Sequence, residues 1–117
     1  MTVLTQGNEP YEFLLSEANG MRSRSQVTVT IAGGVALPSG TVLGKITATG
    51  KFVKYDEAGT DDGRRVAAAV LGTPLAGTNG DIKATVFERD CEVIGARMTG
   101  LDANGTADLK LLGVIVR

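Results

Sequence analysis

Any covalent chemistry in this chain would centre on Cys91, because it is the single cysteine and the chain contains no histidine. Without histidine there is no Ser-His-Asp or Cys-His pair, no two-histidine metal site and no imidazole general base. Cys91 itself lies two residues before Val93 in a pattern that alternates apolar and polar residues, which is typical of a buried strand. We therefore expect Cys91 to be a packing residue, and we expect no catalytic residue and no enzyme activity.

Two glycine-lysine pairs, Gly44-Lys45 and Gly50-Lys51, partly resemble a phosphate-binding loop. Such a loop needs four residues between its glycines and a Ser or Thr after the lysine. Here five residues intervene, and Phe52 follows the second lysine. The pairs are better explained as turns flanked by solvated lysines, so we expect no cofactor.

Acidic residues cluster in the loop from Asp56 to Asp62 and again around Asp102 and Asp108. Carboxylates at close spacing supply the oxygen ligands that calcium prefers, but the regular ligand spacing of an EF-hand is missing. Asp, Asn and Gly are also the residues that turns and helix starts require. We expect a solvated loop at the first cluster, a helix start at the second, and no metal site.

Composition and charge limit the classes of molecule that this protein is expected to bind. A formal net charge of -1 gives no general attraction to nucleic acid or anionic lipid. The sequence shows neither a standard secretory signal nor a long apolar run, so we expect no direct nucleic-acid or membrane partner. Hydrophobic residues make up 43% of the chain and aromatic residues 4%, which predicts one core of Val, Leu, Ile and Ala.

Period-two alternation, as in Val27, Val29 and Ile31, predicts a mostly β structure. The stretch 65–71 is ambiguous because its alanines favour a helix, but Gly72 and Pro74 limit its length, and we interpret it as a strand. Strands are expected at 27–31, 41–47, 52–55, 65–71, 82–87, 91–94 and 114–116.

Turn and capping residues complete the expected fold. Asn79-Gly80 is typical of a tight hairpin turn before the strand at 82–87. Residues 106–112 could form one short C-terminal helix, with Thr106 or Asn104 at its start, Leu109 and Leu112 facing inward and Gly113 ending it.

The first 25 residues lack a sustained hydrophobic period, so we expect a flexible, extended N-terminal arm at 1–25, mobile in the free protein, and a compact β-rich domain at 26–117. Within the arm, an apolar cluster could pack onto the domain's own core. Alternatively it could cross to a neighbouring subunit and add a strand there, while the arginines meet acidic groups. The candidate binding residues of the arm are Phe13, Leu14, Leu15, Arg22 and Arg24.

The order and spacing of several short stretches resemble the head decoration proteins of tailed phages related to lambda. The stretches are 12–20 followed by Arg22-Ser23-Arg24, 40–46 running into 51–56, 67–71 with the later 89–93, and the ending 111–117. Met1 to Gln6 has no feature that matches this family. The resemblance covers nearly the whole chain from about Gly7.

This resemblance implies a structural virion protein made in the host cytoplasm. Members bind as homotrimers to the major capsid protein on the outer surface of the expanded head, at three-fold sites, and stabilise it against DNA pressure. It implies no cofactor, a β-tulip or barrel-like fold, a decoration domain at 26–117 and a capsid-binding arm at 1–25.

Two other classes stay open. The stretch 37–43 looks like the strand-turn-strand sequence pattern of biotinyl or lipoyl carrier barrels, which suggests a carrier domain. The carrier lysine is missing, however, because Lys51 lies between Gly50 and Phe52 and Lys83 lies inside a strand pattern. The other class is a generic oligomeric β module of a phage tail or baseplate.

Overall fold

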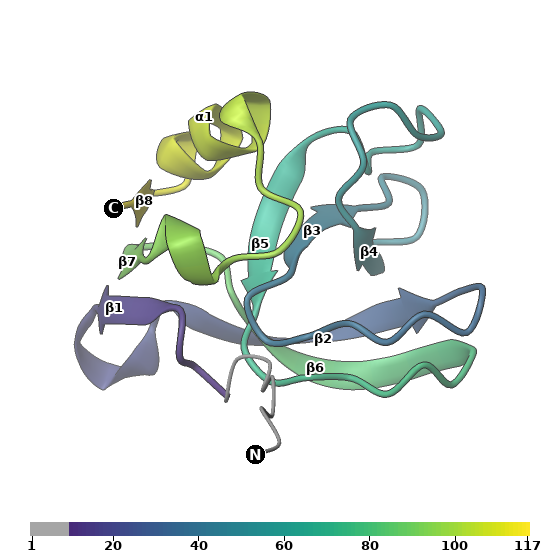
Figure 1. The fold of residues 1–117 in the computed structure, drawn as a ribbon, viewed down its shortest axis with the longest axis horizontal. Coiled ribbons are helices and arrows are strands. Elements are labelled where there is room, and N and C mark those ends of the chain that lie inside the picture. The colour runs from purple at the N-terminus through teal and green to yellow at the C-terminus, as the bar shows by residue number, and fades with distance from the viewer. Residues whose placement is uncertain (1–9) are drawn as a thin grey trace, which may run out of the picture.

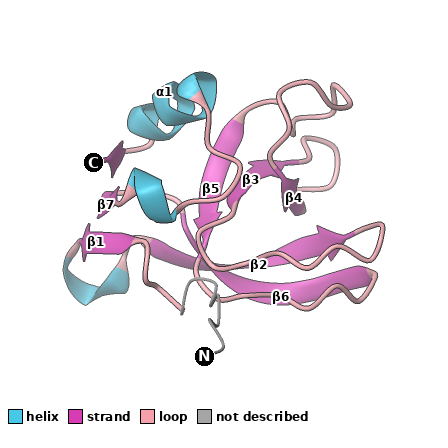
Figure 2. Cartoon of the chain, viewed as in Figure 1, coloured by secondary structure: helices cyan, strands magenta, loops and turns pink. Residues whose placement is uncertain are grey.

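Two sheets and one α-helix form residues 10–117, the part of the chain that the computed structural model describes (Figures 1 and 2). The expected mostly β fold with one short C-terminal helix is confirmed. In chain order the elements are β1 (Leu14–Glu17), η1 (Asn19–Met21), β2 (Arg24–Ile31), β3 (Val42–Lys45), β4 (Phe52–Lys54), β5 (Ala67–Leu71), β6 (Gly80–Phe87), β7 (Cys91–Val93), η2 (Gly95–Arg97), α1 (Ala103–Leu111) and β8 (Val114–Val116).

One sheet is a closed barrel in the order β2-β4-β3-β5-β6. Its longest pairing is the antiparallel ribbon of β2 and β6, which runs from Arg24 opposite Phe87 to Ile31 opposite Gly80. The β2 and β4 pairing is parallel. Alternate side chains point into the barrel and form an aliphatic core with one aromatic ring. This core contains Val29, Ile31, Leu37, Leu43, Phe52, Ala69, Leu71, Leu75, Ala84 and Val86.

The second sheet has the order β1-β7-β8 and packs with α1 over a separate core. Figure 1 shows these short strands grouped near the helix and away from the free end of the β2 and β6 ribbon. Phe13 and Phe87 meet edge to face in this core, with ring centroids 5.6 Å apart. Leu109 of α1 is fully buried in the same cluster. The second core therefore ties the chain before β1 to both the barrel and the helix.

The helix begins at Ala103, earlier than either expected start, Asn104 or Thr106. Asp102 is its N-cap, and Asp102 Oδ1 accepts a hydrogen bond from the Gly105 N–H at 2.6 Å. Leu109 faces inward as expected, but Leu112 is 40% exposed because it lies beyond the last helical residue. Gly113 has φ +83, so it ends the helix in the left-handed conformation that glycine adopts readily.

The prediction of a tight hairpin at Asn79-Gly80 is wrong. The main partner of β6 is β2, and β5 pairs only with Val86 and Phe87 at the far end of β6. A wide loop thus joins β5 to β6. Asn79 instead stabilises a contact between loops, because its Oδ1 accepts a hydrogen bond from the Gly34 N–H at 2.7 Å.

Candidate functional site

The apolar cluster of the expected arm divides between the core and the surface. Phe13 is completely buried, and Leu14 is half-buried against the same core. Leu15, the first outward side chain of β1, is 53% exposed. The Phe13 side chain therefore fills the protein's own core, and Leu15 is the apolar residue of this cluster that a partner could contact.

The Arg24 side chain binds to residues of its own chain. Its Nε and Nη2 donate to the two carboxylate oxygens of Glu17 at 3.0 and 2.7 Å, and its guanidinium carbon lies 4.6 Å from the centroid of the Tyr11 ring. The hydrogen bonds from Arg24 to Glu17 raise the pKa of the arginine further above its ordinary value. Arg24 thereby joins β1 to the start of β2.

Arg22 lies in the turn between β1 and β2 and is open to solvent. Its side chain is 70% exposed, and its Nε is 3.8 Å from Asp90 Oδ2, which makes a loose surface pair. The structure thus leaves Leu15 and Arg22 accessible among the candidate arm residues. Their role in binding stays a prediction, as does the division of the chain at residue 25. Residues 1–9 of the expected arm lie outside the described residues.

A second surface, which the sequence reasoning did not identify, lies between β5 and the end of α1. We call it the apolar patch and define it by Val66, Ala68, Leu111 and Leu112. Val66 is 56% exposed, and Leu111 is 88% exposed. These residues line a groove of about 470 Å³ that also borders Phe52 of the barrel. A contiguous exposed apolar surface of this kind is typical of an interaction site.

Hydrogen bonds and charges fix the shape of the apolar patch. Asp108 Oδ2 accepts a hydrogen bond from the Ala67 N–H at 3.0 Å, which holds α1 against the start of β5. Lys45 lies at the groove with its Nζ 5.8 Å from the centroid of the Phe52 ring. Glu88 and Arg89 form an adjacent ion pair on the same groove. The patch is therefore an apolar centre with a charged rim, the usual arrangement of a protein interface.

The signal for this patch was present in the helix sequence. Leu109 and Leu111 are two residues apart, and positions with that spacing point to nearly opposite sides of a helix. Burial of Leu109 therefore required Leu111 to face outward. Val66 had no such signal, because its exposure depends on where β5 begins.

The side chains that were considered for chemistry have structural roles. Burial raises the pKa of the Cys91 thiol to about 11, with smaller contributions from Glu17 and Asp90. The Nζ of Lys51 lies 2.6 Å from Asp81 Oδ2. Asp62 of the acidic loop pairs with Arg64 at 2.8 Å, and the hydrogen bonds from Arg64 lower the pKa of that carboxyl group.

Within residues 10–117 no group of three or more Cys, Asp or Glu side chains has the arrangement of a metal site. The helices in this part of the chain are too short to cross a membrane. Three surfaces of the described chain carry exposed or groove-lining side chains that bear on function: the apolar patch, the side chains near β1, and a cleft beside β4.

Comparison with known proteins gives one family. The family model described as Bacteriophage lambda head decoration protein D matches residues 3–114. The match includes the barrel, β1, β7 and α1, and it ends at the first residue of β8. No curated protein matches the chain.

Proposed function

The chain belongs to the bacteriophage lambda head decoration protein family, and from this we propose that it binds as a trimer to the outside of the expanded phage head and stabilises the shell. The sites would be the three-fold positions where major capsid subunits meet, and the load would be the pressure of packaged DNA. The role is structural rather than catalytic. The observation that carries the proposal is the family match over residues 3–114.

The apolar patch supports self-association. A cyclic trimer has heterologous interfaces, so the patch of one subunit would cover a different surface of the next. Leu111 and Val66 would lose their solvent exposure there, and removal of apolar surface from water is the main driving force of association. Lys45, Glu88 and Arg89 around the groove would set the orientation of the neighbouring subunit.

The segment near β1 supports a second contact, with the capsid. Leu15 offers an exposed apolar side chain on a strand whose outer edge is free in the described sheet order. Arg22 offers a solvent-exposed positive charge nearby in the chain. A capsid strand could add to the β1 edge through main-chain hydrogen bonds, with Leu15 in an apolar pocket and Arg22 next to an acidic group. Three such contacts per trimer would act together through their effective concentration.

The experiment that tests the proposal combines native mass spectrometry with binding to undecorated expanded shells of the cognate phage. We expect a species with three times the chain mass, co-sedimentation with expanded shells, and survival of decorated shells at temperatures that rupture bare shells. Unexpanded shells are the control, and they should take up little protein. A monomer that leaves expanded shells undecorated would overturn the proposal.

A further inference from the structure

The barrel has one weak seam, between β2 and β4. Within the described chain the register of this parallel pairing contains a single residue pair, Val29 opposite Phe52. After that pair both strands continue, β2 to Ile31 and β4 to Lys54, without pairing to each other. The two strands therefore diverge toward their C-terminal ends.

Main-chain groups face the gap that this divergence leaves. On β4, the Tyr55 N–H donates to the Val42 carbonyl and the Lys51 carbonyl accepts from Ile46, so the odd-numbered residues point their main chain toward β3. The main chain of Lys54 then points toward β2, because successive residues of a strand alternate. On β2, the Ser23 carbonyl accepts from the Glu88 N–H, so by the same alternation Thr30 faces β4.

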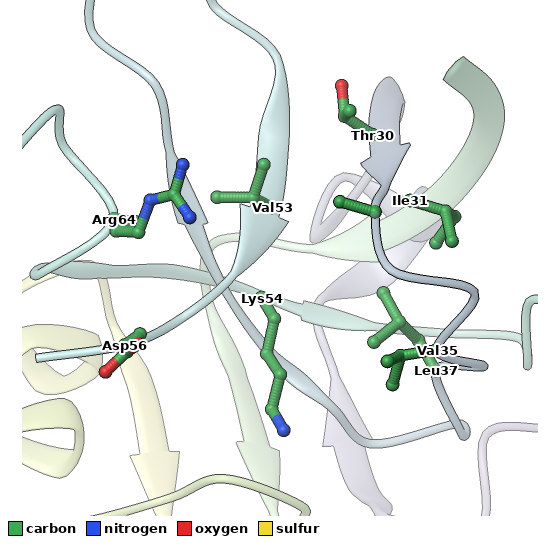
Figure 3. A pocket seen from close by; sticks show the side chains of 9 residues that line it. Thr30, Ile31, Val35, Leu37, Val53, Lys54, Asp56 and Arg64 are labelled. Atoms are coloured by element: carbon green, nitrogen blue, oxygen red, sulfur yellow. The ribbon is translucent and has the colours of Figure 1, made fainter. Parts of the chain in front are cut away.

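A cleft of about 340 Å³ lies at this seam. Figure 3 shows Ile31, Val35 and Leu37 on one side of the cleft and Val53 on the other, with Lys54 extending from β4 between the two groups. Val35 is 53% exposed at the rim, whereas Leu37 is buried in the barrel core. The floor is thus apolar and continuous with the interior of the barrel, and the volume matches the smaller binding sites of proteins.

The charges at the rim favour an acidic partner. Lys54 is exposed and forms no ion pair with any residue of the described chain. Arg64, on the other side of β4 in Figure 3, is held by Asp62. Asp56 also lines the cleft, but its charge is offset by the nearby Arg64, whose pKa it helps to raise, and its Oδ1 accepts a hydrogen bond from the Ala58 N–H at 3.1 Å within its own turn. Among the described residues that line the cleft, Lys54 is therefore the positive charge without an ion-pair partner.

We propose that this cleft, defined by Thr30, Ile31, Val35, Val53 and Lys54, binds an extended segment of a capsid subunit that carries apolar side chains and a carboxylate. Free strand edges select an extended main chain, the floor takes alternate apolar side chains, and Lys54 pairs with the carboxylate. The inference rests on the proposed function for the source of the segment. It adds a third contact, separate from the apolar patch and from β1.

The test compares two charge reversals of the same kind, Lys54→Glu at the cleft and Lys83→Glu on the exposed part of β6. Both should keep the wild-type melting temperature, because both lysines are solvent-exposed. We expect Lys54→Glu to weaken co-sedimentation with expanded shells by about tenfold or more, and Lys83→Glu to bind within about twofold of the wild type. Val35→Glu, which introduces a charge at the apolar rim, should resemble Lys54→Glu.

Two further measurements identify the occupant. A photoreactive group on Lys54→Cys should cross-link to the capsid subunit, at a peptide that contains an acidic residue between apolar residues. Hydrogen exchange at Lys54, the β4 residue whose main chain faces the gap, should slow on shells, since strand addition protects main-chain amides. Wild-type binding with unchanged affinity for both Lys54→Glu and Val35→Glu, or cross-links only to another copy of this chain, would overturn the inference and leave the proposed function intact. Absence of shell binding by the wild type would instead overturn the proposed function.

Discussion

Arg24 and Glu17 form a paired hydrogen bond across the junction of the two sheets, with 2.7 Å between Nη2 and Oε1. Both side chains are largely shielded, with 27% and 20% of their surfaces exposed. Arg24 also lies over the rings of Tyr11 and Phe87. The pair therefore joins β1 to the barrel, although the two residues are only seven positions apart in the chain.

Loss of this pair should loosen β1 more than the barrel. Arg24→Met keeps much of the packing on Tyr11 but removes both hydrogen bonds, and we expect it to cost about 1–2 kcal/mol in urea unfolding. Arg24→Lys keeps the charge but loses the bidentate hydrogen bonding, so its stability should fall between those of the wild type and Arg24→Met. Hydrogen exchange should increase first in β1. Equal stability of all three proteins would show that the pair contributes nothing.

Acid should destabilise the helix cap. Hydrogen bonds from the Gly105 N–H and the Tyr55 hydroxyl lower the pKa of Asp102 below its ordinary 3.8. The folded pKa is thus below the unfolded one, so this contribution to stability is complete above about pH 3.8 and is lost as the pH falls through the folded value.

Two substitutions separate the charge of Asp102 from its hydrogen bonds. Asp102→Asn keeps an oxygen that accepts both bonds but cannot titrate, so its stability should decline less steeply with acid than that of the wild type. Tyr55→Phe removes one donor, should cost about 1 kcal/mol at neutral pH, and should begin to lose stability at a slightly higher pH. Denaturant unfolding between pH 2 and pH 7 measures both. Parallel pH curves for Asp102→Asn and the wild type would contradict this account of the cap.

Local patterns predicted the elements well where a strand has one buried face. The alternation at 27–31 lies in β2, because side-chain period follows directly from the direction of burial. The run at 65–71 contains β5, which is buried on both faces and shows no such period, so its assignment depended on the length limit set by Gly72 and Pro74. The C-terminal helix was predicted but its start was set too late, because Asp102, Asn104 and Thr106 are all suitable N-cap residues and no local signal selects Asp102 among them. The Asn79 side chain bonds another loop, a long-range choice that no local window contains.

The N-terminal segment shows why the candidate site was harder to predict. Residues 14–17 have too little local pattern to indicate a strand, and β1 exists because Glu17 lies opposite Cys91 of β7. A partner that distant in the chain is set by tertiary packing and not by propensity. The apolar patch depends likewise on the position of α1 beside β5, which the Asp108 carboxylate fixes.

Cys91 should be inert in the folded protein. With a thiol pKa of about 11, roughly one thiol in a thousand is ionised at pH 8, and the side chain is 4% exposed. Iodoacetamide should therefore modify the folded protein slowly and the unfolded protein fast, as read by mass spectrometry. Cys91→Ala should cost about 1–2 kcal/mol without changing shell binding. Rapid alkylation of folded protein, or loss of binding by a folded Cys91→Ala variant, would contradict this assignment.

The apolar patch should control the oligomeric state. Leu111→Glu places a charge at the most exposed leucine of the patch, where the monomer loses little but a subunit interface would bury it. We expect a folded monomer by light scattering and weak shell binding, because the benefit of several linked contacts is lost. Lys110→Glu, one residue away on the same helix and also exposed, is the control and should keep the oligomeric state of the wild type. An identical mass for Leu111→Glu and wild type would place the interface elsewhere.

Substitutions at two neighbouring apolar residues near β1, Phe13 and Leu15, should have separate effects on folding and on shell binding. Phe13 is completely buried against Phe87, so Phe13→Ala should cost about 3–5 kcal/mol and lower the melting temperature strongly. Leu15 is 53% exposed, so Leu15→Lys should change stability by about 0.5 kcal/mol or less. If β1 contacts the capsid, Leu15→Lys should nevertheless weaken binding to expanded shells. Phe13→Leu, a milder core change, should remain folded and bind shells as the wild type does. Wild-type binding by Leu15→Lys, together with weakened binding by a folded Phe13→Leu protein, would reverse these roles and exclude the β1 surface as a capsid contact.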